Sequence, residues 1–213
     1  MYIPPHFEES DLAAILGLIE ANPLAAIVTH RSPGLDANHI PLLVDSRPPG
    51  RFTLIGHVSR QNQLWRQASP DEAVLVLFRG AEGYISPNWY PGKTRNENQV
   101  PTWNYQVLNL RGTLEVVDDE KFVRGVVARL ITKHEGSQPK PWKMTDSDPD
   151  YISEQLTKIV GIRITVTDVE AKFKLSQNRS QEDGLGAAQG AGSAGNVALG
   201  KAMLEAYGRK GKQ

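Results

Sequence analysis

The feature that most constrains this chain is a succession of short strand-like segments with turn signals between them and few helical stretches. In the clearest segment, Ile162, Ile164 and Val166 alternate with polar residues, so that one face of the strand is apolar. The strand-like segments cover residues 24–30, 38–45, 51–58, 73–78, 103–117 and 162–167. About six strands at such short spacing predict a mainly β protein, an antiparallel barrel with peripheral helices.

Helical patterns occur only between or beside these segments. Apolar residues at helical spacing predict one helix over residues 12–19 and another over residues 118–132. Shorter helices are predicted over residues 59–67 and 151–158. These helices are too few to alternate with the strands, which is a further indication of antiparallel strand pairing.

The C-terminal part of the chain has a different composition. Residues 184–195 read GLGAAQGAGSAG, with five glycines and four alanines, and resemble a flexible linker. A final helix is predicted over residues 196–207, and the basic end GRKGKQ is expected to fray. We therefore expect one domain over residues 1–183, followed by a Gly/Ala-rich linker with a C-terminal helix and tail over residues 184–213.

Composition excludes several kinds of protein and site. The chain has 24 Lys and Arg against 24 Asp and Glu, so a broad basic field for nucleic acid is absent, although a local patch stays possible. It has no cysteine, which excludes disulfides, thiol catalysis and cysteine–metal sites and suits the cytoplasm. The N-terminus lacks the pattern of a secretory signal, and residues 12–28 are too short and too interrupted to cross a bilayer.

Common catalytic and metal-binding motifs are missing as well. The five histidines do not have metal-ligand spacing, and the chain contains no nucleophile elbow or Walker loop and no GxGxxG motif that follows a predicted strand. No pair of helices carries a basic second member as a helix-turn-helix would. We predict no catalytic side chain and no metal ligand.

The segment ANHIPL, residues 37–42, is the first candidate binding segment. Asn38 and His39 are polar residues in a strand that otherwise favours apolar ones, and they are followed by Ile40. Pro41 cannot donate to a strand ladder, which predicts a sheet edge, a bulge or a wall facing a ligand. The alternative is a strand with an ordinary solvent-facing side.

The second candidate is GHVSRQNQLW, residues 56–65, where a strand ends and a helix is expected to begin. Free backbone N–H groups at a helix start, the Ser59 hydroxyl and the Arg60 guanidinium together suit a phosphate. His57 lies two residues before Ser59 in this segment. The alternative is that Ser59 is a helix cap and Arg60 a surface charge.

The third and fourth candidates contain aromatic residues and cations. In VPTWNY, residues 100–105, Trp103 and Asn104 at a strand start are expected to present a flat apolar face and an amide side by side, as a planar ligand requires. The alternative is that the tryptophan covers the mouth of the barrel. In AKFKLSQNRS, residues 171–180, three cations within eight residues favour either an anion contact or a solvated charged face.

Taken together, these segments resemble the FMN-binding negative transcriptional regulators of the PaiB type. The resemblance covers nearly the whole chain, from MYIPPHF through ANHIPL, GHVSRQN, YISPNWY, VPTWNY and PW to AKFKLSQNRS. It implies a split β-barrel like that of flavin reductases and pyridoxine phosphate oxidases, in which two chains pair and FMN lies at their interface. The implied FMN contacts are Asn38, His39, Ile40, Pro41, His57, Val58, Ser59, Arg60, Thr102, Trp103, Asn104, Lys174 and Gln177.

The resemblance also assigns roles within this set. It implies that Asn38 to Pro41 line the flavin, that His57 to Arg60 hold its phosphate, and that Arg60 is the principal cation. It implies that Thr102 to Asn104 approach the ring and that Lys174 and Gln177 close the site from the same or the partner chain. The chain departs from the family at Asn109, where a histidine is expected, and in the Ala/Gly-rich stretch after residue 183.

Three functions follow as hypotheses. The first is an FMN-binding, homodimeric transcriptional regulator in the cytoplasm, although neither the net charge nor a motif supports direct DNA contact. The second is a flavin-dependent oxidoreductase, for which the flavin would supply the chemistry. The third is a haem-binding barrel with His39 or His57 as the iron ligand.

Overall fold

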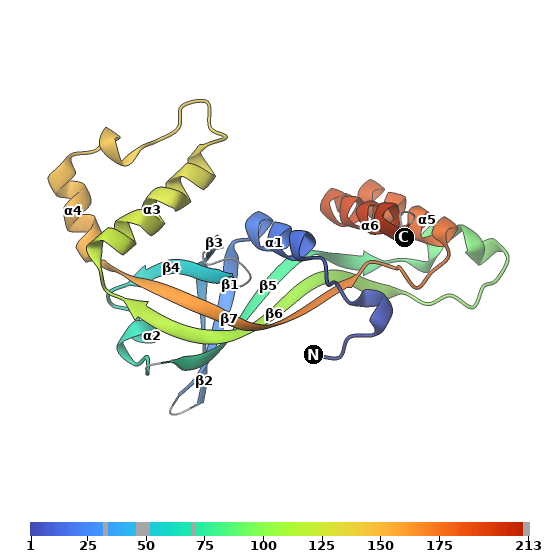
Figure 1. Cartoon of the computed structure of the whole chain (residues 1–213). Coiled ribbons are helices and arrows are strands. Elements are labelled where there is room, and N and C mark those ends of the chain that lie inside the picture. Colours follow the sequence, from blue (N-terminus) through green and yellow to red (C-terminus); the bar gives the residue numbers. More distant parts are fainter. Residues whose placement is uncertain (32–33, 46–51, 70, 211–213) are drawn as a thin grey trace. The chain divides into compact units, whose positions relative to one another are not determined.

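The computed structural model describes residues 1–31, 34–45, 52–69 and 71–210. The chain folds as two compact units (Figure 1). The first unit comprises Met1–Ala21, Phe78–Asn109 and the residues from Glu170 onward. The second unit comprises Asn22–Leu77 and Leu110–Val169. Three long strands contribute residues to both units.

Seven strands form one sheet in the order β2-β1-β5-β6-β7-β4-β3. They are β1 (Leu24–Arg31), β2 (Gly34–Pro41), β3 (Leu43–Asp45), β4 (Thr53–Ser59), β5 (Glu72–Ile85), β6 (Thr102–Val117) and β7 (Ile159–Lys174). β1 pairs with β2 and with β5, and β4 pairs with β3 and with β7, in every case antiparallel. The sheet is not closed into a ring, because β2 and β3 lie at its two ends. The predicted antiparallel arrangement is therefore confirmed.

In the second unit, helices cover part of the sheet. These are α2 (Gln63–Arg66), α3 (Glu120–Glu135), α4 (Pro149–Thr157) and the 3-10 turn η4 (Met144–Asp146). Val126 of α3 packs against Leu43 and Ile55, and Val123 packs against Ile152 and Leu156 of α4. The helix predicted over residues 118–132 begins slightly later than expected, because the Asp119 side chain accepts the Phe122 N–H and so caps α3. It continues to Glu135.

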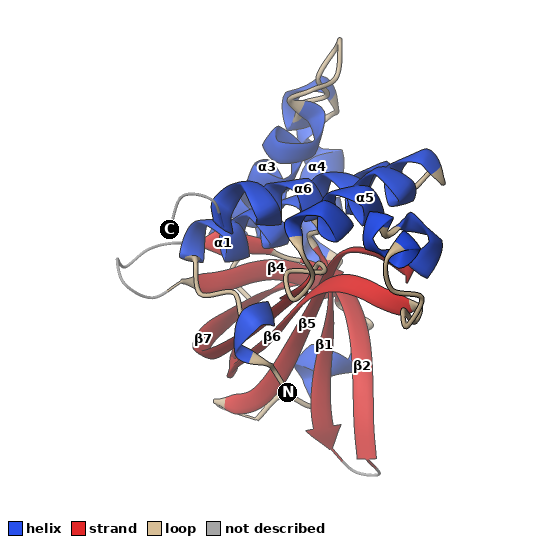
Figure 2. Ribbon diagram, turned by 90° about the vertical axis from the view of Figure 1, so that its right-hand side faces the viewer, coloured by secondary structure: helices blue, strands red, loops and turns tan. Residues whose placement is uncertain are grey.

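In the first unit, η1 (Pro5–Phe7), α1 (Leu12–Ala21), η2 (Pro87–Trp89), η3 (Pro91–Thr94), α5 (Gln181–Ser193) and α6 (Val197–Lys210) accompany the strands. Figure 2 shows α5 beside α6, and the two helices pack closely against each other. The flexible-linker interpretation of residues 184–195 is wrong, because this segment is most of α5. The division at residue 183 stays a prediction.

The small residues of α5 allow close packing. Ala187, Ala188 and Ala191 are buried. A Cβ on Gly184 would overlap Tyr207 of α6, and a Cβ on Gly186 would lie 2.5 Å from the Trp89 carbonyl oxygen. The same residues that suggest a flexible linker in the sequence thus let one helix lie close to its neighbours. Across the described residues, no helix combines the length and the apolar character needed to cross a membrane.

Candidate functional site

In the second unit, the structure brings the first two candidate segments together. A Cβ on Gly56 of β4 would lie 2.8 Å from Leu42 Cδ2 and 3.0 Å from the Pro41 carbonyl oxygen, so the two backbones approach closely there. Asn62 Nδ2 also donates a hydrogen bond of 2.8 Å to Asn38 Oδ1. Segments about twenty residues apart in the sequence therefore form one surface of this unit.

The ANHIP segment lies on an edge strand. β2 is the terminal strand at one end of the sheet, which is the first of the three alternatives predicted from Pro41. Ile40 is buried, Asn38 is partly buried, and His39 and Pro41 are exposed. Asn38 Nδ2 donates to Asp36 Oδ2 at 2.9 Å, so both ends of the Asn38 amide are fixed. The segment therefore offers a rigid polar side chain next to exposed backbone.

His57 lies in the middle of the β4–β7 pairing. It is in register with Gly161, and it is on the same face of β4 as Ile55, which packs against α3. Its Nδ1 atom is buried and has no hydrogen-bond partner among the described residues. Burial lowers the pKa of His57 below its ordinary value, which favours the neutral imidazole. Val58, on the opposite face, is part of the apolar core.

The predicted helix start differs from the observed one. α2 is a single turn that begins at Gln63, and its cap is Asn62, whose Oδ1 accepts the Leu64 N–H at 2.7 Å. Ser59 is the last residue of β4, and its hydroxyl accepts the Gln61 N–H at 3.2 Å. The prediction that Ser59 caps a helix is therefore wrong. It fails because Asn62 is an equally good capping residue three positions later.

Arg60 is fully engaged within the second unit. Its Nη1 and Nη2 donate to the two carboxylate oxygens of Asp118 at 2.9 and 2.6 Å, and its Nε donates to the Thr157 carbonyl at 2.7 Å. The hydrogen bonds to Asp118 raise the pKa of Arg60 and lower the pKa of Asp118. The guanidinium lies at a cavity of about 340 Å³ whose wall also includes Asp119 and Glu120. A phosphate at Arg60 would have to displace the Asp118 carboxylate.

In the first unit, Lys174 joins the third and fourth candidate segments. Its ammonium donates to Thr102 Oγ1 and to the Trp103 carbonyl, the latter at 2.5 Å. The Trp103 side chain is 51% exposed, whereas Asn104 on the opposite face of β6 is fully buried. The expectation that Trp103 and Asn104 lie side by side is therefore wrong, because neighbouring strand residues point to opposite faces.

Asn104 and Gln177 both contribute to the structure around the end of β7. Asn104 Nδ2 donates to Ser176 Oγ at 2.8 Å, while its Oδ1 is buried with no partner among the described residues. Gln177 Nε2 donates to the Phe173 carbonyl, and its Oε1 accepts the Leu175 N–H. These contacts hold a turn in which Ser176 has a φ of +70°.

Two residues outside the predicted set belong to these surroundings. Asn62 connects the two segments of the second unit, and its place before an apolar pair is a capping signal that the sequence does contain. Asp118 is 58 residues from Arg60 along the chain, and nothing in the local sequence links the two. No group of three or more metal-ligating side chains occurs in the part of the chain that the structure describes.

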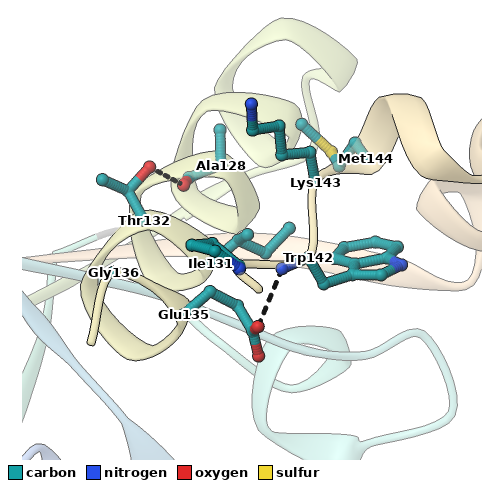
Figure 3. Close-up of a pocket in the computed structure, with 9 residues that line it drawn as sticks. Ala128, Ile131, Thr132, Glu135, Gly136, Trp142, Lys143 and Met144 are labelled. Atoms are coloured by element: carbon teal, nitrogen blue, oxygen red, sulfur yellow. Dashed lines mark hydrogen bonds between the residues drawn. The ribbon is translucent and has the colours of Figure 1, made fainter. Parts of the chain in front are cut away.

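One apolar pocket lies away from all predicted site residues. It has a volume of about 280 Å³ and is formed by the end of α3 and by residues 141–144. Figure 3 shows Glu135 accepting the backbone N–H of Trp142, with Ile131 and Met144 nearby. The Pro141-Trp142 pair, one of the motifs behind the family resemblance, thus shapes a different part of the second unit.

Comparison with known proteins gives a match to one family and matches to individual proteins. The family described as "Putative FMN-binding domain" matches residues 1–168. A relative from Bacillus subtilis, "Protease synthase and sporulation protein PAI 2", is 31% identical over 183 residues, which are 86% of this chain and 85% of the relative. A protein from Aspergillus fumigatus is 29% identical, over 89% of this chain and 90% of its own length.

Solved structures with similar folds have low sequence identity. A conserved hypothetical protein of Mycobacterium tuberculosis, Rv2991, has a TM-score of 0.57 at 13% identity, covering 85% of this chain and 95% of its own. The flavocytochrome Anf3 of Azotobacter vinelandii has a TM-score of 0.56 at 12% identity, covering 81% of this chain and 72% of its own. The FAD and heme binding protein of Mycobacterium smegmatis has a TM-score of 0.53 at 16% identity, covering 78% and 73%. The predicted fold, mainly β with peripheral helices in a split barrel, is confirmed.

Proposed function

Because the chain belongs to the FMN-binding domain family, we propose that it is a cytoplasmic, homodimeric regulatory protein whose ligand is FMN. The family match spans the two candidate segments of the second unit, and the sporulation-related name of the Bacillus subtilis relative supports a regulatory role. The proposed FMN contacts are those implied by the sequence, from Asn38 to Pro41, from His57 to Arg60, from Thr102 to Asn104, and at Lys174 and Gln177.

The residues in these segments fit FMN. The carrying observation is that the two polar segments of the second unit are adjacent, through Gly56 and Pro41 and through Asn62 and Asn38. On the opposite face of β4 from Gly56, His57 Nδ1 is buried without a partner among the described residues. In the first unit, the exposed face of Trp103 suits a planar ring, and Thr102 adds a hydroxyl. When bound, FMN would supply the redox chemistry of its ring, and these side chains would orient it and exclude water.

Arg60 is the proposed phosphate cation, and Asp118 is its competitor. The planar guanidinium binds the carboxylate through two hydrogen bonds and would bind a phosphate in the same way. Binding of FMN would therefore exchange one bidentate anion for another. Removing the Asp118 charge should strengthen FMN binding, provided that Arg60 stays in place through its bond to the Thr157 carbonyl.

The regulatory role does not require this chain to contact DNA directly. Several cations that could contact the phosphate backbone already have partners: Lys93 donates to Asn88 Oδ1, Arg95 pairs with Glu182, and Lys172 is buried. Direct contact needs several free cations and weakens steeply with salt. A gel shift at low salt tests this point, since a retarded complex would contradict an indirect role.

The dimer is proposed from the resemblance and from exposed apolar side chains. In the first unit Tyr84, Val100 and Trp103 are each more than half exposed, and a partner chain would cover such side chains. We expect light scattering at micromolar concentration to give twice the chain mass. A Trp103→Glu substitution should shift the protein toward the monomer, and a monomeric wild-type protein would contradict the proposal.

FMN titration of the Arg60→Gln variant tests whether Arg60 binds the phosphate group of FMN. We expect the Kd for FMN to rise about tenfold or more, the usual consequence of losing a charge-assisted hydrogen bond. Riboflavin lacks the phosphate, so its Kd should not change. Asp118→Asn should lower the Kd for FMN and leave that for riboflavin unchanged.

Arg66→Gln provides a matched control. Arg66 lies over the same Trp65 ring as Arg60, at 5.7 Å against 5.6 Å, and it does not contact Asp118. Its variant should bind FMN like the wild type. An unchanged FMN affinity in Arg60→Gln, or an equal loss of FMN and riboflavin binding, would contradict the assignment and indicate that Arg60 only stabilises the fold.

A flavin-dependent oxidoreductase is the second candidate, because a flavocytochrome shares the fold. Loading the purified protein with FMN and adding NADH or NADPH separates the two functions. Bleaching of the flavin absorbance at a catalytically useful rate would favour the enzyme, and no bleaching with either donor would favour the regulator. A haem Soret band on reconstitution would instead support the third hypothesis, in which a histidine ligates iron.

A further inference from the structure

Three cations gather in the first unit without a carboxylate partner. Lys172 Nζ donates to the Tyr2 carbonyl at 3.1 Å and lies 5.4 Å from the centre of the Tyr105 ring. Lys174 donates only to Thr102 and to the Trp103 carbonyl, and Arg179 Nη1 donates to Gln99 Oε1 at 2.9 Å. Within the described residues, every one of these acceptors is uncharged.

Arginines outside this cluster do have carboxylate partners in the first unit. Arg95, for example, pairs with Glu182, and Arg209 pairs with Glu9. The buried carboxylate of Asp183 accepts the Gly92 N–H at 2.7 Å and makes no ion pair with a described residue. The chain as a whole has as many acids as bases, so the unpaired cations do not follow from its composition.

Burial makes the unpaired charges costly. Lys172 is only 9% exposed, and Lys174 is partly buried. Desolvation, together with the neighbouring charges of Lys172 and Arg179, lowers the pKa of Lys174. A positive charge that is withdrawn from water and repelled by other cations gains strongly from an anion placed among them.

The cluster also retains unused donors held in fixed positions. The guanidinium of Arg179 uses one nitrogen for Gln99 and lies over the Tyr90 ring at 5.0 Å, so its other N–H groups stay free. The Arg179 backbone N–H donates to the Ser176 carbonyl at 2.9 Å, which fixes the turn that carries this side chain. Lys174 retains a third N–H, and the Thr102 hydroxyl, which accepts from Lys174, has its own proton to donate.

We propose that Lys174, Arg179 and the Thr102 hydroxyl form an oxyanion site that binds the phosphate group of a small ligand. Lys174 and Arg179 stand on the two sides of one turn and contact Thr102 and Gln99, three residues apart. A phosphate dianion matches two such cations, whereas a single carboxylate would leave one of them uncompensated. This site belongs to the first unit and uses neither Arg60 nor Asp118, although Thr102 and Lys174 are also among the proposed FMN contacts. The phosphate comes either from FMN itself or from a second phosphorylated molecule, and the two sources are separable by experiment.

Inorganic phosphate is the probe, added to flavin-free protein at constant ionic strength. Phosphate should raise the melting temperature of the wild type more than acetate does, and calorimetry should give a phosphate Kd. In Lys174→Met and Arg179→Met, which keep an apolar stem without the charge, that Kd should rise about tenfold or more. Without phosphate, both variants should melt at or above the wild-type temperature, since each removes a repelled charge.

Lys201→Met is the matched control, because Lys201 lies on α6 of the same unit with its side chain 76% exposed. It should bind phosphate like the wild type. Arg60→Gln removes any phosphate bound at the proposed flavin site, and the part of the phosphate response that depends on Lys174 should persist in that variant, so failure of the Arg60 assignment would not affect this site. A phosphate shift that persists in Lys174→Met, or a Lys174→Met protein that melts far below the wild type, would overturn the inference.

The same variants identify the source of the phosphate. If Lys174→Met weakens FMN binding but not riboflavin binding, FMN supplies the phosphate that the cluster binds. If the variant binds FMN and riboflavin like the wild type while losing inorganic phosphate, the ligand is a second phosphorylated molecule. Both results support the oxyanion site. A Lys174→Met protein that binds inorganic phosphate and FMN as tightly as the wild type would contradict it.

Discussion

Replacing Gly56 by alanine tests whether the ANHIP and GHVSR segments form one surface. The added Cβ would lie 2.8 Å from Leu42 Cδ2 and 3.0 Å from the Pro41 carbonyl oxygen. The leucine methyl can move by rotation about its side-chain bonds, but the carbonyl belongs to the backbone and can move only with β2. The substitution therefore forces the two strands apart or strains both.

Overpacking of this kind typically costs about 1–3 kcal/mol. For a chain of this size, each kcal/mol changes the melting temperature by about 2–4 °C. We therefore expect Gly56→Ala to lower the melting temperature by several degrees and to reduce the free energy of unfolding in a denaturant titration. The Kd for FMN should also rise, because Asn38 and His57 are carried by the displaced strands.

Gly125→Ala is the control within the same unit. Gly125 is exposed on α3, and nothing lies within 4 Å of an added Cβ, so alanine should be neutral or stabilise the protein by up to about 1 kcal/mol. A Gly56→Ala protein as stable as the wild type, with unchanged FMN affinity, would refute the close approach of the two segments and with it their joint role.

Two further predictions concern buried polar groups. Because burial holds the pKa of His57 below 6.5, the unfolded chain takes up a proton there before the folded chain does, so the free energy of unfolding should fall as the pH drops below about 6.5. Denaturant titrations above and below that pH should show a smaller change for His57→Gln, and an equal change in both proteins would contradict the assignment. Burial also raises the pKa of Tyr207 to about 12, and its hydroxyl donates to the Ser176 carbonyl at 2.5 Å. Tyr207→Phe should lower the free energy of unfolding by about 1–3 kcal/mol, since it leaves that carbonyl unpaired, and no loss would show that the bond is not needed.

Local sequence patterns predicted much of the fold. Alternation of apolar and polar residues depends only on neighbouring positions, and it located parts of every strand except the short β3 as a separate element. Pro41 predicted an edge, a bulge or a wall facing a ligand, because proline cannot donate to a strand ladder, and β2 is an edge strand. The family resemblance rests on the order of short motifs along the chain, and this order can be read from the sequence alone.

Helix α5 could not be predicted from the sequence. Glycine and alanine lack large side chains, so their local pattern favours flexibility as much as a helix. The helix is stabilised by close contact with Trp89 and Tyr207, residues that are distant in the chain. Such packing overrides local propensity, and it depends on neighbours that only the folded chain supplies.

By itself, the sequence determined the strands and the four segments rich in polar and charged residues, because these depend on spacing along the chain. Between an edge, a bulge and a ligand-facing wall at Pro41, the structure decided for the edge. The tertiary structure decided which segments meet: β2 with β4, and the start of β6 with the end of β7. It also decided that Arg60 is paired with Asp118 whereas Lys174 has no counter-charge among the described residues. The physical reason is that a charge acquires its partner and its desolvation only when distant parts of the chain come together.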